Sequence, residues 1–266
     1  MSALGPFLGA ALIFTCASIF GVLFQGLPDL KNYDRRYLKY CGVLFVTYEV
    51  LLLLAIGLAH THLQSIELGM INYLWPSLTI LFAVPILKQK IGFILVAGML
   101  LSLIGIGTIL QSGQDWSIAN MVQNVKSNPI AYLLVFVGAI LWALYNNLVR
   151  KFNNSGYSTI PFLTVTGILF WVLWLVCPAQ QAPVWSVRAI SELLILGLFM
   201  SVAYNVWNIG MQKGNMLVLT LASYFTPALA ALLASLILHT LPSGSFWLGL
   251  SLLILGALTS WVGSKR

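Results

Sequence analysis

The sequence predicts an all-α integral membrane protein built from an inverted repeat. Of its 266 residues 60% are hydrophobic and only 7% are charged, and the apolar residues form nine long runs. A soluble domain carries about 25% charged residues, whereas one membrane-spanning helix needs about 20 apolar residues. We therefore expect nine transmembrane helices with the lipid bilayer as their solvent.

The nine apolar segments follow one another through mostly short connections, which makes sequential helices antiparallel neighbours. They run over Gly5–Phe24, Tyr40–Ala59, Ile66–Leu87, Ile91–Leu110, Pro129–Val149, Ile160–Cys177, Ile190–Gln212, Met216–Leu238 and Phe246–Val262. A longer polar stretch, residues 111–128, separates the fourth segment from the fifth. Its apolar residues Ile118, Met121, Val122 and Val125 have helical spacing, which predicts a short helix at the membrane surface.

Basic residues fix the expected orientation. Eleven of the thirteen lie in the connections after segments one, three, five and seven or at the C-terminus, and the other side holds only Lys126 and Arg188. Positive charges accumulate on the cytoplasmic side of membrane proteins. We therefore expect Lys265 and Arg266, at the C-terminus, to lie in the cytoplasm.

An internal repeat organises the chain. Tyr73-x-x-Pro76 recurs as Tyr224-x-x-Pro227, an offset of 151 residues, and the same offset relates Gly98 to Gly249 and Gly105 to Gly256. These motifs lie on segments three and eight and on segments four and nine. Related segments are five apart, so they cross the membrane in opposite directions, as in an inverted repeat.

The repeat predicts two domains of unequal length. Residues 1–128 form a first, four-helix unit, and residues 129–266 form a second unit of five helices. Segment five has no partner in the first unit. We therefore expect that this chain lacks the first helix of a symmetric ten-helix parent, through truncation or a late start site.

Inverted repeats place substrate sites near the bilayer midplane, between the halves. Polar and aromatic residues in the middle of segments two, three, five, seven and eight are therefore the candidates for substrate binding. They are Tyr48, Asn72, Tyr73, Trp75, Trp142, Tyr204, Trp207, Asn208 and Tyr224. A cavity lining is the preferred interpretation, and hydrogen bonding between helices is the alternative.

Glu49 is the ionisable residue that lies deepest in a segment, about ten residues inside. A charge at that depth is costly and indicates function. We expect Glu49 to bind a substrate ammonium or to carry a coupling proton. The alternative is a protonated carboxyl that is hydrogen-bonded to Tyr or Asn for structural reasons.

Two prolines occupy matched positions in the two halves. Proline removes a backbone hydrogen bond and kinks a helix, so Pro76 and Pro227 are predicted to act as paired hinges. The glycines at 98, 105, 249 and 256 place small residues on one face of segments four and nine, which allows close helix packing.

Several function classes are disfavoured by missing patterns. The histidines and cysteines show no metal-ligand spacing, and the chain has no phosphate-binding Gly-Lys-Ser/Thr loop. It also has no Ser/His/Asp or paired-carboxylate arrangement, so we expect neither an enzyme nor a cofactor. The net charge of +7 reports orientation in the membrane, not nucleic-acid binding.

Four stretches of the sequence resemble a known family of transporters. GMINYLWPSLTILFA, LFVTYEVLLLLAIGLAHTH, YNVWNIGMQKGN and SYFTPALAALLA together resemble the aromatic amino acid exporters of the drug/metabolite transporter (EamA-type) superfamily. The resemblance covers the chain from its first segment, which is similar to the family's second. It implies two inverted five-helix halves around a central cavity in the bacterial inner membrane. It also places the family's aromatic cavity lining on Tyr73, Trp75, Trp142, Tyr204 and Trp207.

The expected function is therefore alternating-access export of Phe, Tyr and Trp, extended to other neutral amino acids, through an aromatic-lined cavity. The partners are the small-molecule substrate and the lipid bilayer, with a monomer as the working expectation. The alternative is a proton antiporter of the same fold for multiple drugs and lipophilic cations, which would depend on Glu49. A membrane enzyme or a purely structural subunit is a further alternative.

Overall fold

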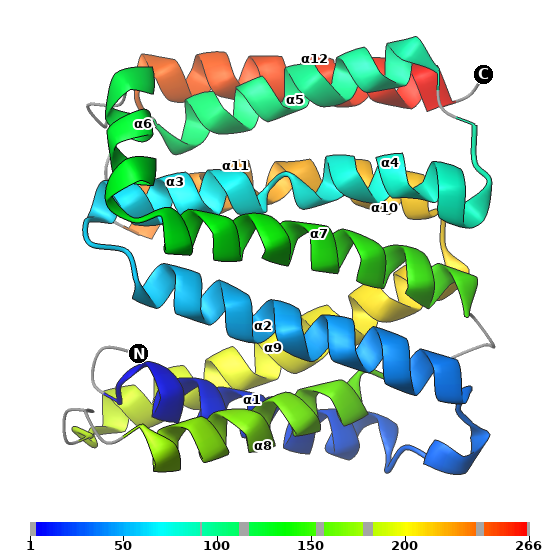
Figure 1. Cartoon of the computed structure of the whole chain (residues 1–266), viewed down its shortest axis with the longest axis vertical. Coiled ribbons are helices and arrows are strands. Elements are labelled where there is room, and N and C mark those ends of the chain that lie inside the picture. Colours follow the sequence, from blue (N-terminus) through cyan, green and yellow to red (C-terminus); the bar gives the residue numbers. More distant parts are fainter. Residues whose placement is uncertain are drawn as a thin grey trace. The chain divides into compact units, whose positions relative to one another are not determined.

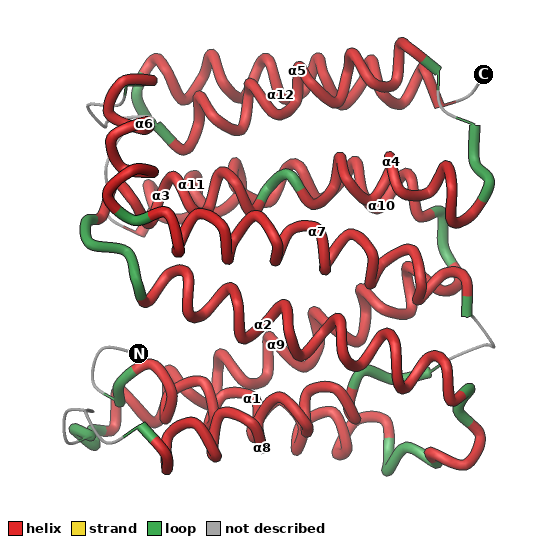
Figure 2. The backbone as a smooth tube through the Cα atoms, in the orientation of Figure 1, coloured by secondary structure: helices red, strands yellow, loops and turns green. Residues whose placement is uncertain are grey.

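The computed structural model describes residues 4–90, 92–111, 117–152, 157–177, 183–237 and 242–264. Within these ranges the regular secondary structure is entirely helical (Figure 2). The described residues contain eight helical spans long and apolar enough to cross a membrane, some made of consecutive helical elements, and Ile160–Val176 is a shorter apolar helix. The all-α membrane fold is thus confirmed. The predicted segment ends Ile91 and Leu238, and Lys265 and Arg266, lie outside the described residues.

The chain divides into two compact units, each combining residues from both halves of the sequence. Unit 1 comprises Met1–Leu53 and Leu148–Gly214, and unit 2 comprises Leu54–Asn147 and Asn215–Arg266. In chain order the helices up to the middle of the chain are α1 (Pro6–Gln25), the 3₁₀ turn η1 (Leu30–Asn32), the π-helical turn η2 (Tyr37–Cys41), α2 (Gly42–Gly57), α3 (His62–Asn72), α4 (Trp75–Leu87), α5 (Phe93–Leu110) and α6 (Ile118–Ser127). The remainder are α7 (Pro129–Lys151), α8 (Ile160–Val176), α9 (Val187–Lys213), α10 (Met216–Ala222), the 3₁₀ turn η3 (Ser223–Phe225), α11 (Thr226–Ile237) and α12 (Gly244–Ser264) (Figure 1).

In unit 1, α1 packs against both α8 and α9. Small residues make this approach possible. A Cβ atom on Gly197 of α9 would lie 2.5 Å from the Cβ of Cys16, and one on Gly21 would lie 2.7 Å from Cγ1 of Ile160. Close backbone approach through glycine is typical of membrane helices, since lipid provides no hydrophobic force that would drive them together.

In unit 2, α5 and α12 lie side by side through the glycines that the repeat relates (Figure 1). A Cβ on Gly98 would lie 2.6 Å from the carbonyl oxygen of Gly256, and one on Gly105 would lie 2.7 Å from that of Gly249. Each glycine of α5 therefore faces the repeat partner of the other. The predicted close-packing face is present, and it is the contact between the last long apolar helices of the two halves.

Both helices that carry the repeated proline are interrupted. The predicted third segment consists of α3 and α4, and the eighth consists of α10, η3 and α11. Pro76 and Pro227 are the second residues of α4 and α11, respectively. The N–H groups of a first helical turn have no intrahelical partner, so proline costs no hydrogen bond there. The expected kink is thus a break, after which a new α-helix begins one residue before each proline.

Three residues of the α3–α4 pair contact side chains of α7. Tyr132 donates a hydrogen bond to Glu67, Trp142 packs edge-on against Trp75, and the amide of Asn147 binds the carbonyl of Thr79. The positions 151 residues later, on α10 and α11, are exposed: Val218, Thr226 and Ala230. Among the described residues, then, α10 and α11 lack the cover that α7 gives to α3 and α4.

The short helix predicted within residues 111–128 is α6. The Ser117 hydroxyl accepts a hydrogen bond from the backbone N–H of Asn120 at 3.1 Å and so caps its first turn. Thr61 caps α3 in the same way, accepting from the N–H of Gln64 at 3.1 Å. This cap explains why α3 begins at His62, four residues before the predicted segment.

Candidate functional site

The predicted site residues form two groups, one in each unit. Unit 1 contains Tyr48, Glu49, Tyr204, Trp207 and Asn208. Unit 2 contains Asn72, Tyr73, Trp75, Trp142 and Tyr224, together with both hinge prolines. Each group combines elements from the two sequence halves, as expected of residues that the repeat brings together.

The buried carboxyl of unit 1 is held by a phenol. Glu49, on α2, is 7% exposed, and its Oε1 accepts a hydrogen bond from the hydroxyl of Tyr204 on α9. Phe45, one turn before Glu49, contacts the Tyr204 ring edge-on with centroids 5.0 Å apart. Tyr48 beside them is buried, and Trp207 is half-buried on α9. The carboxyl can therefore accept a proton, or bind a cation if Tyr204 moves aside.

A polar stripe that the sequence reading did not identify runs along α9. Ser201, Asn205, Asn208 and Gln212 are all at most 2% exposed, and their spacing of four, three and four residues places them on one helix face. The oxygen of Asn205 accepts hydrogen bonds from Ser158 Oγ at 3.0 Å and from Thr159 Oγ1 at 2.8 Å. The stripe thus holds the segment that leads into α8. Its helical spacing was the available signal.

Asn208 belongs to this stripe. Its amide nitrogen donates to the hydroxyl of Tyr37 at 3.2 Å and to the carbonyl of Tyr157, and the Gln212 amide donates to the same carbonyl at 2.8 Å. An amide has two hydrogens to donate. In this conformation both are engaged within unit 1, so Asn208 positions Tyr37 and Tyr157. Its predicted contact with a substrate stays a prediction.

Arg150 fixes the end of α9. Its Nη1 donates to the carbonyl oxygens of Gln212 at 2.6 Å and of Gly214 at 3.0 Å. The last carbonyls of a helix have no intrahelical partner and carry partial negative charge. A guanidinium at this position donates hydrogen bonds to these carbonyls and offsets their negative charge. From the sequence alone, Arg150 is predicted only as one of the basic residues of the cytoplasmic side.

Unit 2 contains a cluster of three aromatic rings between α4 and α7. The rings of Trp75 and Trp142 are 6.3 Å apart and nearly perpendicular, and Trp142 stacks on Tyr145 at 4.8 Å with an interplanar angle of 21°. All three side chains are at most 9% exposed. Edge-to-face and offset-stacked pairs at these separations are the favoured aromatic geometries.

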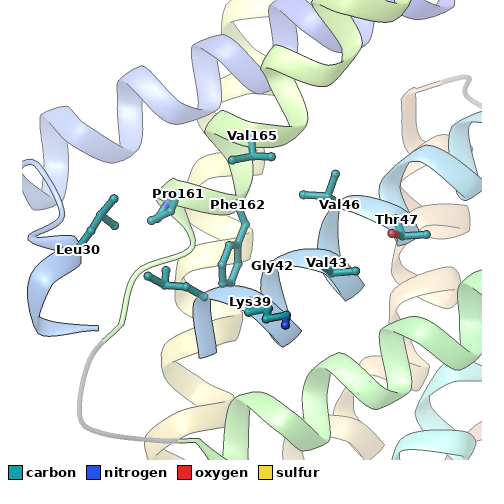
Figure 3. A pocket seen from close by; sticks show the side chains of 10 residues that line it. Leu30, Lys39, Gly42, Val43, Val46, Thr47, Pro161, Phe162 and Val165 are labelled. Carbon is teal, nitrogen blue, oxygen red and sulfur yellow. The ribbon is translucent and has the colours of Figure 1, made fainter. Parts of the chain in front are cut away.

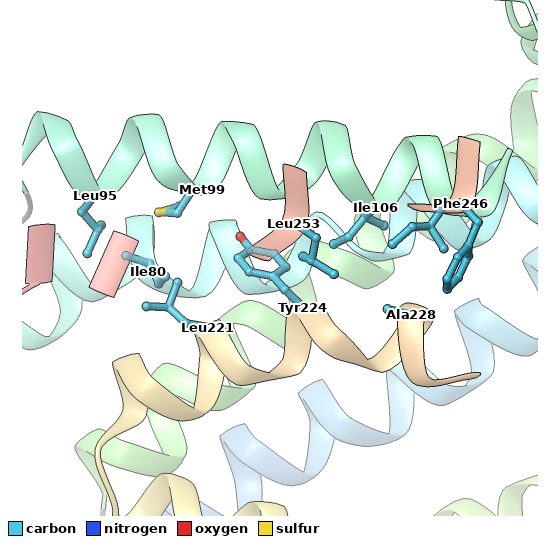
Figure 4. Close-up of a cluster of buried hydrophobic side chains, with 10 residues drawn as sticks. Ile80, Leu95, Met99, Ile106, Leu221, Tyr224, Ala228, Phe246 and Leu253 are labelled. Atoms are coloured by element: carbon cyan, nitrogen blue, oxygen red, sulfur yellow. The ribbon is translucent and has the colours of Figure 1, made fainter. Parts of the chain in front are cut away.

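The repeated tyrosines of unit 2 differ in environment. Tyr224 is completely buried in an apolar cluster to which α4, α5, α10, α11 and α12 contribute (Figure 4), and its hydroxyl is hydrogen-bonded to that of Ser77. Tyr73, its repeat partner, is partly buried against the same cluster. Asn72 beside it is half-buried. In this conformation Tyr224 packs the core, whereas Tyr73 and Asn72 retain accessible surface.

No group of three His, Cys, Asp or Glu side chains that could hold a metal occurs in the described part of the chain. The candidate groups are thus two, described separately: a buried carboxyl–phenol pair in unit 1 and an aromatic cluster in unit 2. Such groups can bind an ammonium, a proton or an aromatic ring by noncovalent contact.

The profile of the EamA-like transporter family matches residues 129–262. The chain is 37% identical to the aromatic amino acid exporter YddG of Salmonella typhimurium and 35% identical to that of Escherichia coli. Both matches cover 99% of this chain and 89% of the relative. A solved crystal structure with 26% identity is similar over 99% of this chain and 90% of its own, with a TM-score of 0.80.

These relatives and the apolar helices place the chain among multi-pass transporters of the bacterial inner membrane. Its fold, with broken helices and close-packed glycines at repeat-related positions, agrees with that assignment. The chain belongs to the EamA-like transporter family.

Proposed function

We propose that this protein exports the aromatic amino acids Phe, Tyr and Trp, with other neutral amino acids as secondary substrates, by alternating access. The observation that carries the proposal is the similarity, over 99% of the chain, to two exporters named for aromatic amino acids. We further propose that residues 1–128 and 129–266 act as the two transporter repeats, with the C-terminus in the cytoplasm.

The chemistry of unit 2 supports an aromatic cargo. Trp75 and Trp142 already interact through their π systems, and an aromatic substrate can take part in the same edge and face contacts. Such contacts are worth about 0.5–1.5 kcal/mol beyond the burial of apolar area. They discriminate weakly between Phe, Tyr and Trp, so substrate specificity is loose. Asn72 and Tyr73, which keep accessible surface, supply polar groups for the amino acid's charged end.

The Glu49–Tyr204 pair in unit 1 supports a role in recognising positive charge. A carboxyl at this depth either binds the substrate ammonium or takes up a proton when Tyr204 releases it. A proton antiporter for lipophilic cations is the second candidate function, and the burial of Glu49 is the observation that favours it. Both candidate functions use Glu49, so they must be distinguished by measuring which substrate is transported.

Transport by the purified chain in proteoliposomes tests the proposal. Uptake of labelled Trp is measured with unlabelled amino acids or a lipophilic cationic dye as competitors. We expect Phe and Tyr to compete strongly and the dye weakly. Competition by the dye alone, with transport driven by a pH gradient, would establish the antiporter instead.

The variant Glu49→Gln separates ammonium binding from proton coupling. If Glu49 couples protons, the substitution abolishes the dependence of transport on a pH gradient. If Glu49 binds the substrate ammonium, the substitution raises KM at every pH. Glu192→Gln is the matched control, because Glu192 is an exposed carboxylate paired with Arg188 at 2.7 Å. Unchanged transport by Glu49→Gln at all pH values excludes both roles.

A further inference from the structure

Unit 1 contains a groove whose lining includes none of its candidate site residues. It has a volume of about 450 Å3 and is bounded by η1, the start of α2 and the start of α8 (Figure 3). This volume is within the range of small-molecule sites, about 300–1,000 Å3. None of the predicted substrate-binding residues lines it.

The walls of the groove suit hydrocarbon and not an amino acid. Seven of the ten lining residues are aliphatic, aromatic or proline, and the polar ones are Lys39 and Thr47. The Phe162 ring lies against Gly42, where an added Cβ would be 3.1 Å from Cε1 of the ring. A zwitterionic solute needs several polar groups to replace its hydration. The groove lacks such a set, whereas an acyl chain requires none.

One end of the groove is positively charged. Lys39 lines it and is exposed, and Lys31 and Arg35 on the same connection are exposed as well. Arg36 is paired with Asp34 at 3.0 Å, and its hydrogen bonds hold the pKa of that carboxyl below the ordinary value. Asp34 is therefore ionised at neutral pH and offsets Arg36, while Lys39 has no carboxylate within salt-bridge distance among the described residues.

The apolar walls and the positively charged end of the groove together favour an amphipathic ligand with a negatively charged end. We propose that this groove binds an anionic phospholipid, with one acyl chain between α2 and α8 and the phosphate held by Lys39. Basic pockets between transmembrane helices on the cytoplasmic side recognise anionic head groups, and the orientation predicted from the basic residues puts this end of α2 on that side. The site is distinct from the proposed transport function and does not depend on it.

Two pairs of variants test the acyl and phosphate contacts separately. Val165→Trp fills the groove, and Val172→Trp is its control, because both valines are on α8, seven residues apart, and are 52% and 47% exposed. Lys39→Gln removes the charge, and Lys151→Gln removes an exposed charge that does not line the groove. Monodisperse elution in detergent establishes that each variant is folded.

Binding is measured by native mass spectrometry of the detergent-purified full chain, titrated with phosphatidylglycerol or phosphatidylcholine of identical acyl chains. We expect one phosphatidylglycerol to bind at least tenfold more tightly than phosphatidylcholine. Val165→Trp should abolish this binding, Lys39→Gln should remove the head-group preference, and both controls should retain it. Equal binding of the two lipids to the wild type, or phosphatidylglycerol binding unchanged in folded Val165→Trp and Lys39→Gln, would overturn the proposal.

Discussion

The hydroxyl groups of Ser77 and Tyr224 form a hydrogen bond beside the interruptions of both broken helices. The repeat relates Tyr224 to Tyr73 and Ser77 to Ala228. The equivalent bond between positions 73 and 228 cannot form, because alanine has no hydroxyl. The two halves therefore share a backbone pattern but differ in the polar contact at its centre. Because of this asymmetry, a substitution at Ser77 tests a contact that the other half of the repeat does not have.

Replacing Ser77 by Ala leaves the Tyr224 hydroxyl buried without this partner. We expect a loss of about 1 kcal/mol in the free energy of unfolding, measured as a lower Tm in detergent. Adding Tyr224→Phe should recover part of the loss, since the orphaned hydroxyl is removed. Ser251→Ala serves as control, because Ser251 is exposed and, within the described part of the chain, its hydroxyl bonds only the Trp247 carbonyl of its own helix, at 2.9 Å. Equal effects at Ser77 and Ser251 would contradict this assignment.

The contact between α5 and α12 predicts sharply different effects at two glycines of one helix. A Cβ on Gly105 meets backbone atoms of α12, whereas one on Gly107 approaches only the flexible ends of Met70, at 3.4 Å, and Gln111, at 4.0 Å. Gly105→Ala should destabilise the protein by about 1–3 kcal/mol through overpacking. Gly107→Ala should be neutral or stabilising, because alanine favours helix. Thermal unfolding of the two variants compares them directly.

Pro76→Ala should slow transport. Proline at the second position of α4 prevents α3 and α4 from joining into one continuous helix, since its ring clashes with the preceding turn. Alanine permits that fusion and removes the flexible break. Pro85→Ala is the matched control, because Pro85 is exposed inside α4 and away from the break. Transport rates in proteoliposomes that are the same for both variants and the wild type would rule out a hinge at Pro76.

The aromatic cluster predicts a selective loss of affinity. Trp142→Ala removes the ring that contacts both Trp75 and Tyr145. If the cluster binds substrate rings, KM for Trp should rise roughly 2- to 10-fold, which corresponds to about 0.5–1.5 kcal/mol of aromatic contact. Trp247→Ala, at a position 52% exposed on α12, should leave KM unchanged. A drop in protein stability without a change in KM would assign the cluster to packing alone.

Glu67 anchors α6. It is completely buried and accepts hydrogen bonds from Tyr132 and, at 3.2 Å to each oxygen, from Asn124 on α6. Asn124→Ala should therefore speed hydrogen exchange of the α6 amides, because a local contact that opposes opening is lost. Gln123→Ala, an exposed neighbour, should not. Identical exchange in the two variants would show that the Asn124–Glu67 contact does not hold α6 in place.

The sequence by itself determined the helices, the repeat and the packing glycines. In a membrane every backbone polar group must be bonded within its own segment, so a run of apolar residues suffices to define a helix such as α1 or α5. Matched motifs at a constant offset likewise need no structure to be seen. The Gly98–Gly105 face was predictable because small residues seven apart lie on one side of a helix.

Only the tertiary structure decided the polar partners and the helix breaks. Tyr204 and Glu49 are 155 residues apart, and no local spacing indicates that one binds the other. The hydrogen bonds that Asn205 and Asn208 make to the segment before α8 join residues that are 46 to 51 positions apart. Proline predicts a disturbed helix, but whether the chain bends or breaks at Tyr73 depends on packing against α5, α7 and α12. Hydrogen bonds between elements that are distant in sequence depend on the fold. They decide which polar residues connect helices and which remain accessible to a substrate.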